Sequence, residues 1–95
     1  MKSTSLIPGA VTLKSLVSEL HEVVDWFHLG VHLDVPDSEL MKIKRSYLEV
    51  DDCKTQVLIF WMKQSLQLTW SAVVRALVGI RMYSLAQKIA IKYGE

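Results

Sequence analysis

The sequence of 95 residues has very little cysteine, glycine or proline: Cys53 is its one cysteine, and it has four glycines and two prolines. One thiol cannot form an internal disulfide, which favours a reducing compartment and predicts a cytoplasmic location. Few glycines and prolines, with 51% hydrophobic residues, argue against collagen-like, low-complexity and disordered chains. The composition predicts one ordinary folded domain that needs no cofactor or metal to fold.

Long hydrophobic runs are also missing. The longest uninterrupted run, from Val57 to Met62, falls far short of the roughly 20 residues that a membrane-spanning helix needs. The first residues, Met1 to Pro8, contain one lysine but no apolar stretch behind it, so they do not resemble a signal peptide. We therefore predict no membrane insertion, a leader at residues 1–11 and one helical domain at residues 12–94.

Enzyme motifs are absent from the sequence as well. It contains no glycine-rich phosphate loop, no G-x-S-x-G elbow and no H-E-x-x-H pair. A helical domain of this size also has little room for the deep pocket that a small-molecule site usually needs. We expect a protein without catalytic activity, small-molecule substrate or cofactor.

The charges that are present are unevenly distributed. Through Met41, two lysines face six acidic residues, and from Lys42 onward nine basic residues face four acidic ones, so the halves carry −4 and +5. A total of +1 argues against a nucleic-acid binder that relies on bulk attraction to phosphate. The imbalance allows the acidic face of one copy to meet the basic face of another, as in a heterologous contact. The alternative is a compact domain in which the two signs mix in space.

Hydrophobic residues recur at helical spacing, and residues that cap or break helices fall between the runs. The first of six predicted helices follows Thr12 as its N-cap, a short second one starts near Asp25 and ends at Val35-Pro36, and Asp37 caps a third. The residues expected to face the core from these helices are Leu13, Leu16, Val17, Leu20, Val24, Trp26, Leu29, Gly30, Leu33, Leu40, Ile43 and Tyr47.

The second half of the chain predicts three more helices and no strand, which makes the fold all-α. Asp51 or Asp52 caps the fourth helix, Thr69 caps the fifth, and Ser84 and Gln87 have the spacing of a capping box for the sixth. The residues expected to face the core here are Val57, Leu58, Trp61, Met62, Trp70, Val73, Val74, Leu77, Leu85, Ala86, Ile89 and Tyr93.

Two polar groups have alternative interpretations. Asp25, His28 and His32 share the expected second helix and could make a metal-binding or pH-responsive module, although a structural zinc site needs a fourth ligand that no spacing supplies. Solvated or interface histidines are the simpler interpretation. Lys42 and Arg45 belong to a basic cluster that could contact phosphates, but the fifth helix offers mostly valine and alanine where a DNA-reading helix needs polar side chains.

Three further residues stand out on the expected fourth helix. Ile59 and Phe60 fall on its outer flanks, where apolar groups indicate either a binding partner or neighbouring helices that cover one of them. Cys53 lies near the start of the same helix beside Lys54. A small half-buried hydrophobic residue is the simpler interpretation of this cysteine, and a reactive thiol is the alternative.

The order of these helices and their apolar residues resembles the death-domain family of the death-fold superfamily, over roughly Leu13 to Tyr93. Gly30 and Asp34 depart from the family pattern, standing at an alanine and a glycine position. The fragments that carry the resemblance are Trp26-x-x-Leu29-Gly30-x-x-Leu33-x-Val35, Leu40-x-x-Ile43, Val57-Leu58-x-x-Trp61-Met62, Thr69-Trp70-x-x-Val73-x-x-Ala76-Leu77 and Leu85-Ala86-x-x-Ile89.

The resemblance implies a six-helix antiparallel bundle with Greek-key topology. It also implies a non-enzymatic adaptor module for signal transduction, including apoptosis, that binds other death-domain proteins and possibly itself. Three surface patches follow from the family. The first, on the second and third helices, comprises Asp25, His28, His32, Ser38, Lys42 and Arg45; the second, on the first and fourth helices, comprises Glu19, Glu22, Asp51, Asp52 and Phe60; the third, near the junction of the fifth and sixth helices, comprises Arg75 and Arg81.

Overall fold

Six helices and no strand are found in the residues that the structure describes, 11–66 and 68–93 of a computed structural model. This confirms the all-α class and the helix order. The predicted leader, apart from Val11, and Gly94 at the end of the predicted domain lie outside these residues. The helices are α1 (Leu13–Glu19), α2 (Trp26–His32), α3 (Asp37–Ser46), α4 (Val50–Gln64), α5 (Trp70–Gly79) and α6 (Tyr83–Tyr93).

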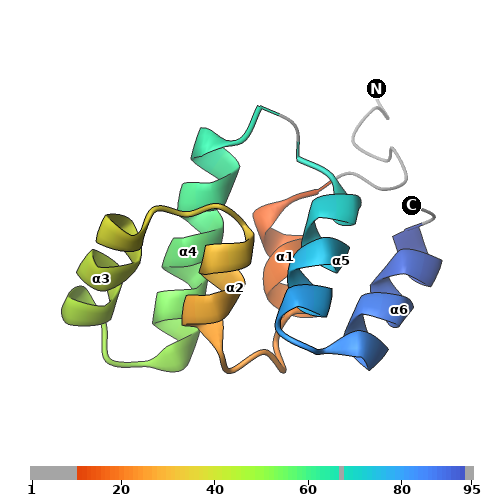
Figure 1. Cartoon of the computed structure of the whole chain (residues 1–95), viewed down its shortest axis with the longest axis horizontal. Helices are drawn as coiled ribbons and strands as arrows, with labels where there is room; N and C mark the ends of the chain where they lie inside the picture. The colour runs from red at the N-terminus through yellow and green to blue at the C-terminus, as the bar shows by residue number, and fades with distance from the viewer. Residues whose placement is uncertain (1–10, 67, 94–95) are drawn as a thin grey trace.

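The helices are arranged around α2 and α4. Helix α2 packs against α3, α4 and α5, and α4 also packs against α1 and α3. Helix α6 packs mainly against α5, so that α3 and α6 lie at opposite ends of the long axis (Figure 1). No helix in the described ranges is long and apolar enough to cross a membrane.

The core takes side chains from every helix. Trp70 is the largest fully buried side chain, and Leu16, Leu29, Leu58 and Ile89 are also fully buried. Full burial of one such aliphatic side chain contributes about 1.5–3 kcal/mol. The fragments quoted above thus supply most of the core.

Gly30 allows α2 to approach α3 and α4 closely. A Cβ atom at this position would lie 2.5 Å from Cδ2 of Leu40 on α3 and 3.2 Å from Cγ1 of Val57 on α4. No side chain fits in that space without displacing core atoms.

Three helix starts follow the local capping signals. Thr12 accepts a hydrogen bond from the backbone N–H of Ser15 and forms a capping box with it. Asp25 accepts from the N–H of His28, and Thr69 accepts from the N–H of Ala72. Each side chain satisfies a donor that the first helical turn leaves unpaired.

The other helix starts differ from the prediction. Helix α3 has Pro36 at its N-cap and Asp37 as its first residue, without a side-chain cap. Helix α4 begins at Val50, so Asp51 and Asp52 lie in its first turn. Their negative charges interact favourably there with the positive end of the helix dipole. Helix α6 begins at Tyr83, which places the expected capping residue Ser84 inside the helix.

Helices α2 and α5 end in the same hydrogen-bonded turn. After α2, the N–H of Asp34 donates to the carbonyl of Val31 and the N–H of Val35 donates to that of Gly30. After α5, Arg81 and Met82 repeat this pattern. This is a Schellman motif, which needs a left-handed residue after the cap, and Asp34 and Arg81 both have φ of 65°. Thus α2 stops at His32, before the proline.

The end of α1 differs, because a lysine from α4 donates hydrogen bonds to the carbonyl groups there. The ammonium group of Lys54 donates to the carbonyls of Leu20, His21 and Val23 at 2.9, 3.1 and 2.8 Å. Lys54 is only 3% exposed, and its three N–H groups match the three acceptors. The charge also complements the negative end of the α1 dipole.

The predicted core faces need corrections at several positions. Val17 and Val24 are 39% and 69% exposed, and Val23 occupies the core instead. Since α1 ends at Glu19, helical spacing no longer applies to the residues of the following turn. Tyr47 is 37% exposed because α3 ends at Ser46 and Tyr47 has extended backbone. The remaining misplaced residues are partly exposed rather than buried: Leu13, Trp26, Met62, Val74 and Tyr93.

Candidate interaction surfaces

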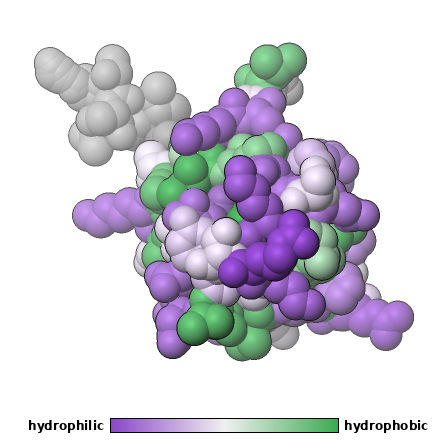
Figure 2. Space-filling view, turned by 90° about the vertical axis from the view of Figure 1, so that its left-hand side faces the viewer, coloured by the Kyte–Doolittle hydropathy of each residue, from purple (hydrophilic) through white to green (hydrophobic). Residues whose placement is uncertain are grey.

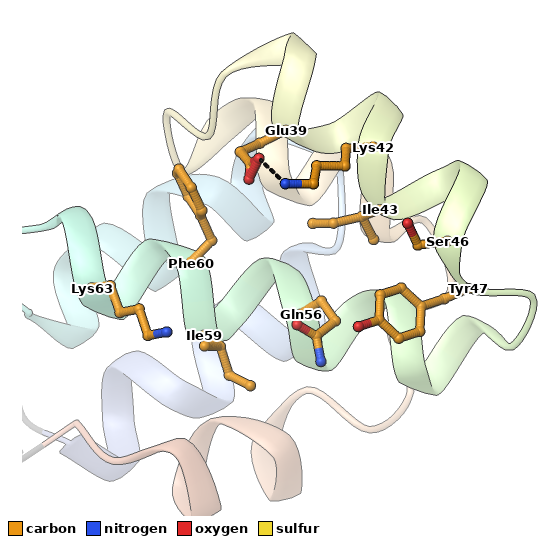
Figure 3. A pocket seen from close by; sticks show the side chains of 9 residues that line it. All are labelled: Glu39, Lys42, Ile43, Ser46, Tyr47, Gln56, Ile59, Phe60 and Lys63. Carbon is orange, nitrogen blue, oxygen red and sulfur yellow. Dashed lines mark ion pairs between the residues drawn. The ribbon is translucent and has the colours of Figure 1, made fainter.

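A shallow groove of about 270 Å³ separates α3 and α4 (Figure 3). Its volume lies at the lower limit for small-molecule pockets, which typically span about 300–1,000 Å³. Helix α3 and the residue after it contribute Glu39, Lys42, Ile43, Ser46 and Tyr47, and α4 contributes Gln56, Ile59, Phe60 and Lys63.

The groove has a basic end and a neutral end. Lys63 lies at the end opposite Tyr47 (Figure 3). Lys42 is paired with Glu39 across 4.0 Å, and its side chain is 73% exposed, so the pair is weak. Lys63 is exposed and has no ion-pair partner in the described ranges. The groove can therefore receive an acidic group at this end.

Ile59 and Phe60, which the sequence marked as outward-facing, are both half-buried. Both line the groove beside Ile43. Phe60 was assigned to the patch shared by α1 and α4, but its side chain lies in the α3–α4 groove (Figure 3). The sequence did not identify the groove because its two walls come from separate helices.

The residues of the first predicted patch are all exposed, but they do not gather in one place. Asp25, His28 and His32 line a hollow on α2 together with Gly79 and Arg81 from the end of α5. Lys42 instead lines the α3–α4 groove. Ser38 and Arg45 lie on exposed positions of α3 that line neither hollow. The structure thus joins part of the first patch to Arg81 of the third patch.

Two local contacts fix the side chains that line the hollow at α2 and α5. Nδ1 of His28 lies 2.9 Å from a carboxylate oxygen of Asp25. The ring of His32 lies against Gly79, where a Cβ atom would come within 2.5 Å of it. Within the described ranges no group of three His, Cys, Asp or Glu side chains has metal-binding geometry. The other residue of the third patch, Arg75, is exposed on α5.

The second predicted patch loses one acidic residue to an internal contact. Glu19 on α1 accepts hydrogen bonds from Lys92 and from the hydroxyl of Tyr93 on α6, and its side chain is 17% exposed. These bonds, above all the one from Lys92, lower the pKa of Glu19. Burial and the bond to Glu19 raise the pKa of Tyr93, whose ring stacks on Trp70 at 3.9 Å. Glu19 is committed to the α1–α6 contact.

The remaining acidic residues of that patch stay exposed. Glu22, Asp51 and Asp52 are all solvent-accessible. A carboxylate oxygen of Asp51 lies 3.7 Å from the Lys54 ammonium, but its side chain is 89% exposed, so water screens this pair. Asp51 and Asp52 are thus exposed acids on the same helix as the groove residues of α4.

Cys53 is a buried residue rather than a reactive one. It is 3% exposed, and its thiol donates a hydrogen bond to the carbonyl of Tyr47 at 3.5 Å. Burial raises the pKa of the thiol, which disfavours the nucleophilic thiolate. The side chain therefore acts as a small apolar group in the core.

The end of the molecule that carries α3 is mainly hydrophilic, with separate hydrophobic areas toward its edge (Figure 2). The basic cluster of Lys42, Lys44 and Arg45 is exposed on this helix. Leu48, in the turn between α3 and α4, is 99% exposed. Charged and apolar surface thus lie next to each other around the α3–α4 pair.

Neither a protein-family model, nor a curated protein, nor a solved structure gives a significant match to this chain.

Proposed function

We propose that this chain is a non-enzymatic protein–protein interaction module of the death-domain type, with Greek-key helix topology, that joins like domains in cytoplasmic signalling complexes. Its partners would be other death-domain proteins and a second copy of itself. Contacts between oppositely charged patches would assemble these partners, as the family resemblance implies.

The core carries this proposal. Of the apolar positions on which the resemblance rests, nearly all are buried, including Leu29, Leu40, Trp61, Trp70 and Ile89. Five short fragments that share one order along the chain and one buried core are better explained by a common fold than by chance. The function follows from the fold only by analogy, so it needs a test of its own.

The departure at Asp34 is consistent with the proposed family. Asp34 stands where the family pattern has glycine, and it has a positive φ of 65°, the conformation that glycine favours. Aspartate tolerates this region better than most residues. The local backbone demanded by a glycine is therefore kept without the glycine.

Reversing two charges on α3 tests the proposal. We expect Lys42→Glu combined with Arg45→Glu to weaken association with a second copy by about tenfold or more, because attraction to an acidic patch becomes repulsion. Light scattering after size exclusion, across protein concentrations at low and high salt, measures the association. High salt should weaken the wild-type contact as well, since it screens exposed charges.

The matched control is Lys14→Glu combined with Lys88→Glu, which makes the same change in net charge at exposed lysines outside the patches. This control should associate like the wild type, and both doubles should keep their helical circular dichroism. Equal weakening by both doubles would show a non-specific charge effect and contradict the patch assignment.

A further inference from the structure

The outer face of α4 carries a graded stripe of four residues. Asp52, Gln56, Ile59 and Lys63 follow one another at spacings of four, three and four, which places them along one face of the helix. Asp52 and Lys63 are exposed, and Gln56 and Ile59 are half-buried in the α3–α4 groove. The stripe is acidic at its first end, neutral in its middle and basic at its last end.

This stripe is complementary to itself when a second α4 runs antiparallel to it. Asp52 and Lys63 lie at equal distances along the chain from the centre of the stripe, and so do Gln56 and Ile59. One twofold axis through that centre therefore places Asp52 opposite Lys63, and Gln56 opposite Ile59, of a second copy. Each contact then occurs twice, as an isologous interface requires. Acid and base lie about 16 Å apart along the helix, so the two ion pairs are independent.

Apolar groups lie beside both ends of the stripe. Leu48, 99% exposed, precedes α4 at its acidic end, and half-buried Phe60 lies toward its basic end with Lys42 on the facing wall (Figure 3). The rotation that pairs Asp52 with Lys63 also places Leu48 of one copy beyond Lys63 of the other, at the end toward which Phe60 lies. Burial of these groups would add hydrophobic contact to the ion pairs.

We infer that α4, flanked by the α3–α4 groove, forms a symmetric contact with α4 of a second copy. This inference deepens the proposed function, on which it rests, because it names a partner and a surface for self-association. The partner is a second copy because the stripe, running antiparallel to itself, presents the opposite order of charges that the stripe requires. The contact closes at two copies, unlike the head-to-tail contact between charge patches.

Charge exchange tests the contact. Lys63→Glu places acid opposite Asp52 twice, and Asp52→Lys places base opposite Lys63 twice, so each variant alone should dissociate about tenfold more readily or worse. The double variant restores both pairs, and so does an equimolar mixture of the two single variants. Every protein in the series carries Arg45→Glu, which weakens the patch contact and lies outside the groove.

Sedimentation velocity supplies the readout, because it resolves a two-copy species from longer ones. Recovery of a two-copy species by the double variant and by the mixture would support the symmetric contact. Lys88→Glu on α6 is the matched control, since it changes an exposed lysine at the other end of the molecule, and it should leave the two-copy species unchanged.

Three outcomes would overturn the inference. The first is that the protein carrying Arg45→Glu alone stays monomeric. The second is that the single variants associate as strongly as this protein does. The third is that the double variant or the mixture forms assemblies longer than two copies. None of these outcomes removes the proposed function, because the double variant Lys42→Glu with Arg45→Glu, compared with the wild type, tests that separately. If reversing Lys42 and Arg45 has no effect while the Asp52 and Lys63 exchange behaves as expected, only the head-to-tail contact between charge patches is contradicted.

Discussion

Lys54 determines how the end of α1 is satisfied. It is the buried charged residue of the described part of the chain, and moving an ammonium group out of water is costly unless hydrogen bonds replace its hydration. Here three carbonyl oxygens replace it, and those carbonyls in turn lie where a helix leaves acceptors unpaired. The lysine and the turn after α1 therefore depend on each other.

We expect Lys54→Met to lower the free energy of unfolding by about 3 kcal/mol. Methionine has a similar length but no donor, so the buried carbonyls lose their partner. Chemical denaturation measures the change. Lys63→Met, at an exposed position of the same helix, should stay within about 0.5 kcal/mol of the wild type. Equal effects of the two variants would mean that water satisfies the carbonyls as well as the lysine does.

At the scale of helices, the ends of α2 and α5 use the same left-handed turn without glycine. Asp34 and Arg81 hold φ of 65°, which costs a residue with a Cβ atom roughly 1 kcal/mol. The hydrogen bonds of the turn offset this cost by satisfying the last carbonyls of each helix. Both turns thus retain some strain that a glycine would remove.

We expect Arg81→Gly to raise the free energy of unfolding by about 0.5–1 kcal/mol, because glycine adopts this conformation without strain. Lys88→Gly is the control, since the same residue placed inside α6 should lower stability by about 1 kcal/mol. Thermal unfolding of both variants measures these opposite changes in stability. A loss of stability in Arg81→Gly would show that the arginine side chain contributes more than the strain costs.

Helices α1 and α6 are joined by an interaction that depends on pH. The Lys92 bond lowers the pKa of Glu19 in the folded protein below its ordinary value of 4.5. A carboxyl with a lowered folded pKa contributes stability above its unfolded pKa, and this contribution is lost as the pH falls through the folded value. The contact should therefore weaken in acid and stay constant near neutral pH.

We expect Glu19→Gln to lose less stability than the wild type between about pH 5 and pH 3, because glutamine does not titrate. At neutral pH the same variant should be less stable, since Lys92 and Tyr93 lose a charged acceptor. Glu22→Gln, at an exposed neighbour, should retain the wild-type acid dependence. Parallel curves for wild type and Glu19→Gln would contradict the lowered pKa.

At the scale of the whole molecule, the helices were predictable because their signals are local. Thr12, Asp25 and Thr69 each cap a helix through a neighbour three residues away. The position of Val24 was not predictable in this way, because it follows a helix end that the apolar spacing does not mark. Lys54 reaches carbonyls 31–34 residues earlier, and no local pattern records a contact of that range.

The candidate surfaces were predictable only as lists of exposed residues. Asp52, Lys42 and Arg45 are accessible as expected, because charged side chains rarely leave water. Their grouping depends on how helices pack, so the sequence separated Arg81 from the histidines beside it and did not place Phe60 in the groove beside α3. The spacing of Asp52, Gln56, Ile59 and Lys63 was the signal present in the sequence for the groove face.

The contact of Glu19 with Lys92 and Tyr93 joins residues 73 and 74 positions apart in the chain. Closing so long a loop costs entropy that local helix formation does not, so we expect this contact to form late in folding. Interactions that form after the rate-limiting barrier slow unfolding and leave the folding rate almost unchanged. We therefore expect the contact between α1 and α6 to lengthen the lifetime of the folded state more than it changes the folding rate.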